Sequence, residues 1–311
     1  MLTIDADTAQ GCLPFDRLVP ALRDAFIAGC EVPPRHHHHG VGNADDSTLL
    51  LMPAWSGAYM GIKLVSVFPG NGQRGLPGLH ASYLLCDADT GQHLALIDGD
   101  QITARRTAAA SALAASYLAR ADSRTLLVLG AGRIGSLMAA AYRSVLPIER
   151  VAVWNPTDAN AQRLVDELNE QGFEAEVADD LEAAVCAADC ISSATLSTTP
   201  LISGAWLRPG THVDLIGSFS PTMREADNDV FTGNSVFVDA PTALHESGDL
   251  IDPLNAGCLT ADQIRADLAA LCQGTHPGRD NDAEITVFKA VGTALEDLAS
   301  ATLIYSTYRN T

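Results

Sequence analysis

The stretch TLLVLGAGRIGSLMAAAYRSVL, residues 125–146, decides the fold of this chain. The run TLLVL predicts a short buried strand, and the apolar residues after the glycines predict a helix. Between them Gly130, Gly132 and Gly135 form the pattern GxGxxG, which is a weak signal alone because glycine-rich turns are common. Here the pattern follows a strand and opens a helix, which is the context that dinucleotide-binding turns require.

Each glycine of the turn has a physical reason. The first allows a tight turn, the second removes a side chain where a pyrophosphate approaches, and the third lets helix and strand pack closely. The helix that follows offers backbone N–H donors and its dipole to a diphosphate. We therefore predict that a dinucleotide binds at Gly130, Gly132, Arg133, Ile134 and Gly135; a purely structural turn is the alternative.

The chain beyond the turn alternates between strand and helix patterns. This alternation predicts an α/β fold with a doubly wound parallel sheet, which binds ligands at the carboxyl ends of its strands. Thr195 and Ser197 follow the fourth candidate strand, and Gly217 and Ser218 follow the fifth. We expect these residues to contact the nicotinamide and its ribose, and the alternative is that they are ordinary loop residues.

The end of the second candidate strand bears on the choice of coenzyme. An acidic residue there would bind the ribose hydroxyls and repel a 2′-phosphate, whereas the chain has Asn155. No arginine immediately follows, and Arg133 in the turn is a substitute cation. The sequence thus favours NADP(H) over NAD(H) and permits both.

Composition limits the partners. The chain has 311 residues, which suggests about two domains, and a net charge of −19, which argues against nucleic acid or an anionic membrane as partner. It contains no apolar run long enough for a membrane span, and its N-terminus lacks the pattern of a signal peptide. Seven cysteines without a CxxC pair predict reduced thiols and a cytoplasmic location.

Two basic residues of the first 120 positions stand in unusual surroundings. Lys63 interrupts an apolar strand pattern, and Arg106 lies in the first turns of an alanine-rich helix. Burying either charge without a partner would be costly. Each is therefore expected to bind an anionic ligand, or to pair with a buried acidic side chain of the protein.

The stretch Arg35–His39 reads RHHHH. In an extended conformation Arg35, His37 and His39 share one face, because side chains alternate along a strand. Two histidines beside an arginine could shape a ligand pocket or donate a proton, and His39 is the candidate donor. No Cys, Asp or Glu partner stands at a recognisable spacing, so no metal site is predicted.

These motifs together resemble the ornithine cyclodeaminase and mu-crystallin family. The resemblance implies a homodimer. Each subunit would have a Rossmann domain, residues 121–287, and a discontinuous domain for substrate binding and dimerisation, residues 1–120 plus 288–311. It also implies that Arg35, Lys63 and Arg106 bind the carboxylate of an amino or imino acid beside the nicotinamide. The matching motifs are PPR, GIKLVSVFPGN, TARRTAAASALAASYLA, LGAGRIG, DCISSATLSTTPLI and ITVFKAVGTALEDLA, which span nearly the whole chain in order.

The family includes cyclodeaminases, alanine dehydrogenases and reductases of cyclic ketimines. The cyclodeaminase type carries an aspartate base just after the fifth Rossmann strand, and Phe219 stands at that place here. Phenylalanine cannot accept a proton. The departure favours NAD(P)H-dependent reduction of Δ1-pyrroline-2-carboxylate or Δ1-piperideine-2-carboxylate to L-proline or L-pipecolate, with Phe219 against the ring.

Other readings stay open at this point. The chain could be an ornithine cyclodeaminase or an alanine dehydrogenase-type oxidoreductase. It could also be a non-catalytic protein of the mu-crystallin type that binds NADPH and a small ligand. The proton donor in a reduction could be solvent, Lys63 or His39.

Overall fold

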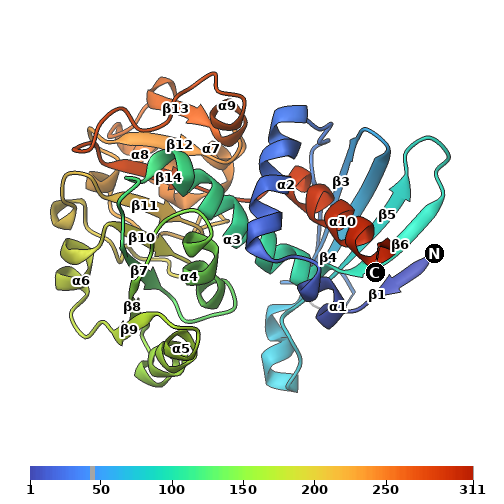
Figure 1. Ribbon diagram of the computed structural model, residues 1–311, viewed down its shortest axis with the longest axis horizontal. Coiled ribbons are helices and arrows are strands. Elements are labelled where there is room, and N and C mark those ends of the chain that lie inside the picture. The colour runs from blue at the N-terminus through green and yellow to red at the C-terminus, as the bar shows by residue number, and fades with distance from the viewer. Residues whose placement is uncertain (43–45, 311) are drawn as a thin grey trace. The chain divides into compact units, whose positions relative to one another are not determined.

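The computed structural model describes residues 1–42 and 46–310. The chain divides into two compact units, which are described separately (Figure 1). Unit 1 is Met1–Arg106 with Thr293–Thr311, and unit 2 is Thr107–Gly292. The first boundary falls after Arg106, inside helix α3 (Gly99–Leu118), whereas the boundary expected from the sequence is position 120. A continuous alanine-rich helix gives no sequence signal for a boundary within it.

Unit 1 contains a six-stranded sheet in the order β1-β6-β5-β4-β3-β2. Strands β2 to β6 pair antiparallel with their neighbours, and β1 joins β6 in parallel. The strands are β1 (Leu2–Ile4), β2 (His36–His39), β3 (Thr48–Ser56), β4 (Tyr59–Val67), β5 (Leu79–Asp87) and β6 (His93–Asp98). The helices are α1 (Ala6–Gly11), α2 (Phe15–Ala28), the 3-10 helix η1 (Pro69–Arg74) and α10 (Ala294–Arg309).

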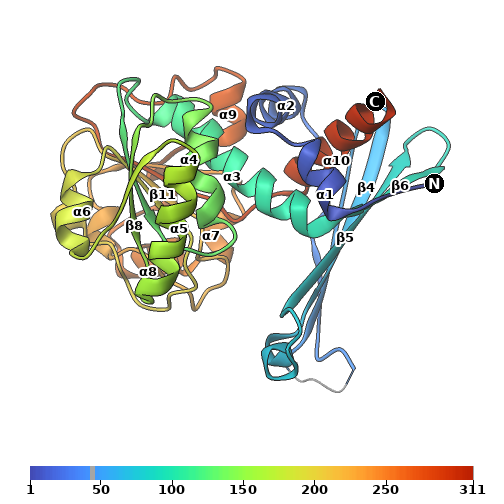
Figure 2. The same cartoon turned by 60° about the horizontal axis from the view of Figure 1, so that its bottom comes forward.

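One face of this sheet is covered by helices. Helix α10 packs on β3, β4 and β5, and α2 packs against α10 (Figure 2). Burial alternates along β4, where Gly61, Lys63 and Val65 are buried while Leu64 is exposed. The covered face therefore carries Lys63, and the opposite face keeps apolar side chains at the surface of the single chain.

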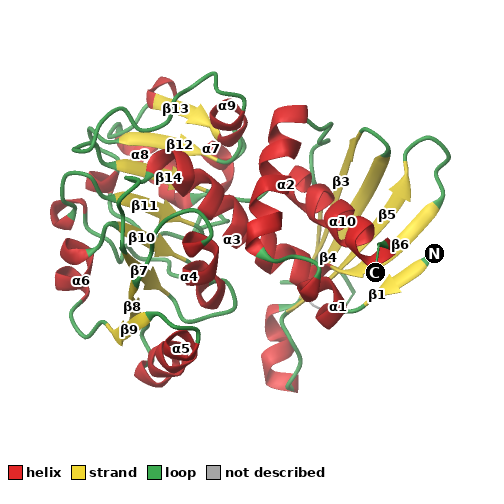
Figure 3. Ribbon diagram, viewed as in Figure 1, coloured by secondary structure: helices red, strands yellow, loops and turns green. Residues whose placement is uncertain are grey.

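Unit 2 contains an eight-stranded parallel sheet in the order β13-β12-β14-β11-β10-β7-β8-β9, flanked by helices (Figure 3). The strands are β7 (Thr125–Leu129), β8 (Arg150–Trp154), β9 (Glu174–Val177), β10 (Cys190–Ser193), β11 (His212–Leu215), β12 (Ser235–Val238), β13 (Ile264–Asp267) and β14 (Thr286–Lys289). The strand order reverses between β7 and β10. Doubly wound sheets bind ligands at such a switch point, outside the carboxyl ends of the strands. The α/β prediction is confirmed.

The helices of unit 2 connect these strands. They are α4 (Gly135–Arg143), α5 (Asp158–Glu170), α6 (Leu181–Ala187), α7 (Ala243–Glu246), α8 (Gly248–Ala256), α9 (Leu268–Cys272) and the 3-10 helices η2 (Gly204–Trp206), η3 (Asn228–Val230) and η4 (Ala261–Gln263). The central strands are buried on both faces, and Leu127, Ile191 and Val213 contribute to one aliphatic core. Within the described residues, no helix has the length and apolar character needed to cross a bilayer.

Candidate functional site

The glycine turn in unit 2 lies between β7 and α4. Gly130 has a φ of 97°, which favours glycine. A Cβ on Gly135 would lie 1.8 Å from the carbonyl oxygen of Gly130, whereas a Cβ on Gly132 would meet no atom within 4 Å. The protein itself therefore requires glycine at 130 and 135. The open space at Gly132 is what a close-approaching pyrophosphate would need.

Asn155 and Arg163 hold the turn from the neighbouring strand and helix. Asn155 Oδ1 accepts a hydrogen bond from the backbone N–H of Ala131 at 3.1 Å, and its Nδ2 donates to the carbonyl of Thr157 at 3.0 Å. Arg163 on α5 donates from Nη2 to the carbonyl of Ala131 at 3.1 Å. The sequence does not mark Arg163 as part of the turn, because it lies nine residues after the end of β8 and resembles an ordinary surface arginine paired at i, i+4 with Glu167.

The ends of β10 and β11 are brought together by a residue that the sequence did not single out. Thr195 and Gly217 both donate to the buried carboxylate of Glu225. The Ser197 hydroxyl donates to the carbonyl of Thr199 at 2.6 Å. Ser218 is fully buried, and its hydroxyl donates to the carbonyl of Met223 at 2.6 Å. Contacts of these residues with a cofactor stay predictions.

Two large apolar side chains are exposed beside these strand ends. Leu196 follows β10 and is 75% exposed, and Phe219 follows β11 and is 58% exposed. In an open parallel sheet this edge is the one that binds ligands. Exposure of Phe219 there agrees with its predicted contact with an apolar ring.

Unit 1 contains a buried group of four charged side chains, which we name the charge cluster: Lys63, Arg106, Glu296 and Asp297. Lys63 Nζ lies 2.7 Å from Asp297 Oδ2, and Arg106 Nε lies 3.1 Å from Asp297 Oδ1. Arg106 Nη1 also lies 2.7 Å from Glu296 Oε2. Asp297 thus contacts both predicted cations. Of the two expectations stated from the sequence for Lys63 and Arg106, the structure shows the second, in which each pairs with a buried acidic side chain.

The sequence does not predict that Glu296 and Asp297 are partners of Lys63 and Arg106. Glu296 and Asp297 lie in the first turn of α10. Acidic residues are common there because they interact favourably with the helix dipole. Their burial is set by packing of α10 on the sheet, which the local sequence does not reveal.

Lys63 has a shifted pKa although it pairs with Asp297. Burial lowers the pKa of Lys63 to about 8, against the opposing attraction of Asp297. Burial alone would raise the pKa of Asp297, but Lys63 and Arg106 together hold it below its usual value. An ammonium has three N–H donors, so one ion pair does not exhaust Lys63. A lysine titrating near neutrality can transfer a proton.

Two of the four histidines in β2 lie on the same sheet face as Lys63. The β-ladders pair Lys63 with Met52, and they pair His37 with Leu50, two residues along the same strand. His37 and His39 therefore share the face of Lys63, and their rings stack with centroids 6.0 Å apart. The predicted shared face of these histidines is confirmed.

Arg35 directly precedes β2 and is half-buried. Burial, followed by repulsion from Arg35 and His39, lowers the pKa of His37. His39 Nδ1 lies 3.0 Å from Thr48 Oγ1. Across residues 1–42 and 46–310 the structure contains no group of three or more side chains that could hold a metal ion. Binding of a substrate carboxylate by Arg35 stays a prediction.

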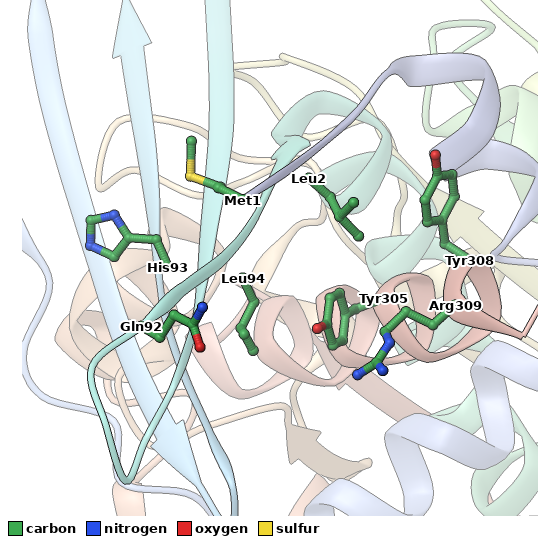
Figure 4. Close-up of a pocket in the computed structure, with 8 residues that line it drawn as sticks. All are labelled: Met1, Leu2, Gln92, His93, Leu94, Tyr305, Tyr308 and Arg309. Carbon is green, nitrogen blue, oxygen red and sulfur yellow. The ribbon is translucent and has the colours of Figure 1, made fainter.

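A separate hollow of about 350 Å³ lies in unit 1 beside both chain termini (Figure 4). Arg309 lies over the ring of Tyr305 there, with its guanidinium carbon 5.6 Å from the ring centroid. The other lining residues are Met1, Leu2, Gln92, His93, Leu94 and Tyr308. This hollow contains no residue of the charge cluster, so we do not assign the substrate to it.

Comparison with known proteins decides the family. The model of the ornithine cyclodeaminase/mu-crystallin family matches residues 16–311. The chain belongs to this family. It is 45% identical to the Delta(1)-pyrroline-2-carboxylate reductase of Paracoccus denitrificans, over 83% of the chain and 82% of that protein. The resemblance inferred from the motifs is confirmed.

Two solved structures show the same fold over the full chain. The Delta(1)-pyrroline-2-carboxylate reductase of Thermococcus litoralis, in complex with NADH and L-proline, is 32% identical with a TM-score of 0.94, covering 100% of this chain and 98% of that one. An archaeal alanine dehydrogenase dimer with bound NAD is 27% identical with a TM-score of 0.93, covering 100% and 97%. Both of these structures contain a bound nicotinamide cofactor.

Proposed function

We propose that this member of the family catalyses NAD(P)H-dependent reduction of a cyclic ketimine carboxylate. The substrate is Δ1-pyrroline-2-carboxylate, Δ1-piperideine-2-carboxylate or both, and the product is L-proline or L-pipecolate. The observation that carries the proposal is the similarity, over most of the chain, to two reductases named for Δ1-pyrroline-2-carboxylate. Lys63 and Arg106 pair with Asp297 and Glu296 in unit 1, and an ammonium with three N–H donors and a guanidinium with five can also donate to a small carboxylate.

The residues have distinct roles in this proposal. Arg106, Lys63 and Arg35 bind the substrate carboxylate, and Phe219 contacts the methylenes of the ring. Lys63, His39 or solvent supplies the proton of the imine nitrogen. The reduced nicotinamide, when bound, supplies hydride to the carbon of the C=N bond. Charge-assisted hydrogen bonds and fixed orientation then lower the barrier.

A substrate panel tests this function. The protein is mixed with NADPH or NADH and Δ1-pyrroline-2-carboxylate, and nicotinamide absorbance is followed. We expect oxidation of the cofactor with the ketimine. Two further mixtures, ornithine with NAD⁺ and pyruvate with ammonia and NADH, address the deaminase and alanine dehydrogenase readings. Turnover of either, without turnover of the ketimine, would contradict the proposal.

We also propose that the dinucleotide is NADP(H) in preference to NAD(H). Asn155 lacks the negative charge that would repel a 2′-phosphate, and Arg133 and Arg163 supply positive charge at the turn. The contacts proposed for the dinucleotide come from Gly130, Gly132, Arg133, Ile134, Gly135, Asn155, Thr195, Ser197, Gly217 and Ser218.

Asn155→Asp tests this preference. The aspartate keeps the acceptor for the N–H of Ala131 and adds a negative charge at the ribose. We expect the ratio of NADPH to NADH affinity to fall at least about tenfold, because charge repulsion disfavours only the phosphorylated cofactor. Dissociation constants from quenching of protein fluorescence measure it. An unchanged ratio would mean that the 2′-phosphate of NADPH does not bind beside residue 155.

The uncovered sheet face supports a homodimer, which we propose as the assembled form. On this face Trp55 is 44% exposed, Leu64 is 43% exposed and Leu96 is 37% exposed. Exposed apolar side chains on one face of a sheet are typical of an interaction surface, and the alanine dehydrogenase of similar fold is a dimer. The seven free cysteines support a cytoplasmic location.

Leu64→Lys is expected to shift the dimer to monomer, since it places a charge in the centre of the apolar face. Light scattering coupled to size exclusion gives the mass. Ile27→Lys is the matched control, because Ile27 is 50% exposed on α2, one of the helices on the covered side. A dimeric Leu64→Lys variant would exclude this face as the interface.

A further inference from the structure

A buried carboxylate joins the ends of two central strands of unit 2. Glu225 is 0% exposed. Its Oε1 accepts from Ser193 Oγ at 2.6 Å, from Thr195 N at 2.8 Å and from Thr195 Oγ1 at 2.8 Å. Its Oε2 accepts from Gly217 N at 2.6 Å. All four groups donate to the carboxylate as they are placed, and a carboxylate only accepts. Burial raises the pKa of Glu225, while Lys289 and the hydrogen bonds from Ser193 and Thr195 oppose that shift and favour the ionised form.

Glu225 is itself fixed from the other side. Its backbone N–H donates to Asp249 Oδ1 at 2.8 Å, and its carbonyl accepts from the N–H groups of Leu201 and Ile202. Asp249 Oδ2 lies 3.3 Å from the ammonium of Lys289, which is fully buried at the end of β14. The carboxylate therefore cannot shift without breaking a network that reaches three strands.

The two segments that Glu225 joins are in close contact. A Cβ on Gly217 would lie 1.9 Å from the carbonyl oxygen of Thr195 and 2.5 Å from Glu225 Oε1. Glycine at 217 is thus explained by this contact. Thr195 is followed by the exposed Leu196, and Gly217 is followed after one residue by the exposed Phe219. Glu225 consequently fixes the backbone that carries both apolar side chains.

We propose that Glu225 is a positioning residue that sets the binding site for the nicotinamide end of the cofactor. It uses both protons of Thr195, the amide and the hydroxyl, so the Thr195 hydroxyl can offer a ligand only an acceptor. The Ser197 N–H donates to this oxygen at 3.3 Å, and a second lone pair remains. An acceptor suits the carboxamide NH₂ of nicotinamide or a ribose hydroxyl. The assignment rests on the proposed dinucleotide-dependent function.

Glu225→Gln tests the assignment. The glutamine has nearly the same shape, but one of its ends becomes a donor that faces Ser193 and Thr195 or Gly217. Two ligands are titrated calorimetrically: NADPH, and 2′-phospho-ADP-ribose, which lacks the nicotinamide. We expect NADPH affinity to fall about tenfold or more, as for loss of a charge-assisted hydrogen bond, with the fragment affinity within twofold of wild type.

A solely structural role of Glu225 would weaken both ligands equally, and that result, or no loss for either, overturns the proposal. If Glu225→Gln does not fold, Glu225→Asp is used, since its shorter side chain cannot reach both Thr195 and Gly217. Glu182→Gln, an exposed acid at the start of α6, is the matched control and is expected to bind both ligands as wild type does. Binding of NADPH without ketimine turnover would contradict the proposed function while leaving this assignment testable.

Discussion

Arg106→Ala is expected to reduce kcat/KM for the ketimine by about three orders of magnitude while NADPH affinity stays nearly unchanged. The guanidinium is one of the two buried cations proposed to bind the substrate carboxylate, and it lies in unit 1, apart in sequence from the glycine turn. Loss of a charge-assisted bidentate partner costs several kcal/mol, which corresponds to this factor. Steady-state kinetics and fluorescence titration of NADPH measure the two quantities.

The truncation also leaves Glu296 and Asp297 without their Arg106 partner in a buried place, which on its own can cost about 3–5 kcal/mol of stability. Arg106→Lys separates the two effects. Lysine keeps the positive charge but cannot make the forked contact, so we expect a smaller kinetic loss of roughly 10- to 100-fold with a melting temperature near that of wild type. Equal losses of turnover and cofactor affinity in both variants would assign Arg106 a structural role.

Local sequence predicted the parts of the fold in which pattern and packing agree. The turn Gly130–Gly135 could be assigned from its neighbours alone, because a strand before it and a helix after it leave few arrangements of the backbone. The structure supports this reading in detail, since Gly130 and Gly135 are fixed by contacts within the protein. The alternation of strands and helices likewise predicted the parallel sheet.

The partners of the site residues could not be predicted in this way. Asp297 lies 191 positions from Arg106 in the chain, and Glu225 lies 30 positions from Thr195. Contacts of this length depend on how helices and loops return to a sheet, and no local periodicity encodes them. The sequence did indicate that Lys63 and Arg106 needed partners. It could not say whether the partner was a ligand or an acid of the protein, and the structure shows that acids are present.

Lys63→Met is the second change with a large expected effect, because it removes the one ammonium in the charge cluster. We expect kcat/KM for the ketimine to fall at least about 100-fold, as for loss of a proton donor together with a carboxylate contact. The residual activity is expected to lose a feature of the pH profile that wild type shows. Steady-state kinetics between about pH 6 and pH 10, roughly two units on either side of the pKa of Lys63, record both effects.

The sign of the pH effect follows from the titration of Lys63. Burial lowers the pKa of its ammonium to about 8, so the cation predominates below that pH and is lost above it. Both proposed roles of Lys63, binding a carboxylate and supplying a proton, need the cation. Wild-type kcat/KM should therefore be level at lower pH and fall about tenfold per pH unit above the pKa. The Lys63→Met variant should lack this limb.

Lys63→Arg distinguishes the two roles. Arginine stays charged across the range, so it can bind the carboxylate but cannot supply a proton. If Lys63 is the proton donor, this variant should recover KM close to wild type, keep a low kcat and show no limb near the lysine pKa. Recovery of kcat as well would assign the proton to His39 or to solvent and leave Lys63 as a carboxylate contact only. A limb that persists in both variants would belong to another group, and titration of Lys63 would then be irrelevant to turnover.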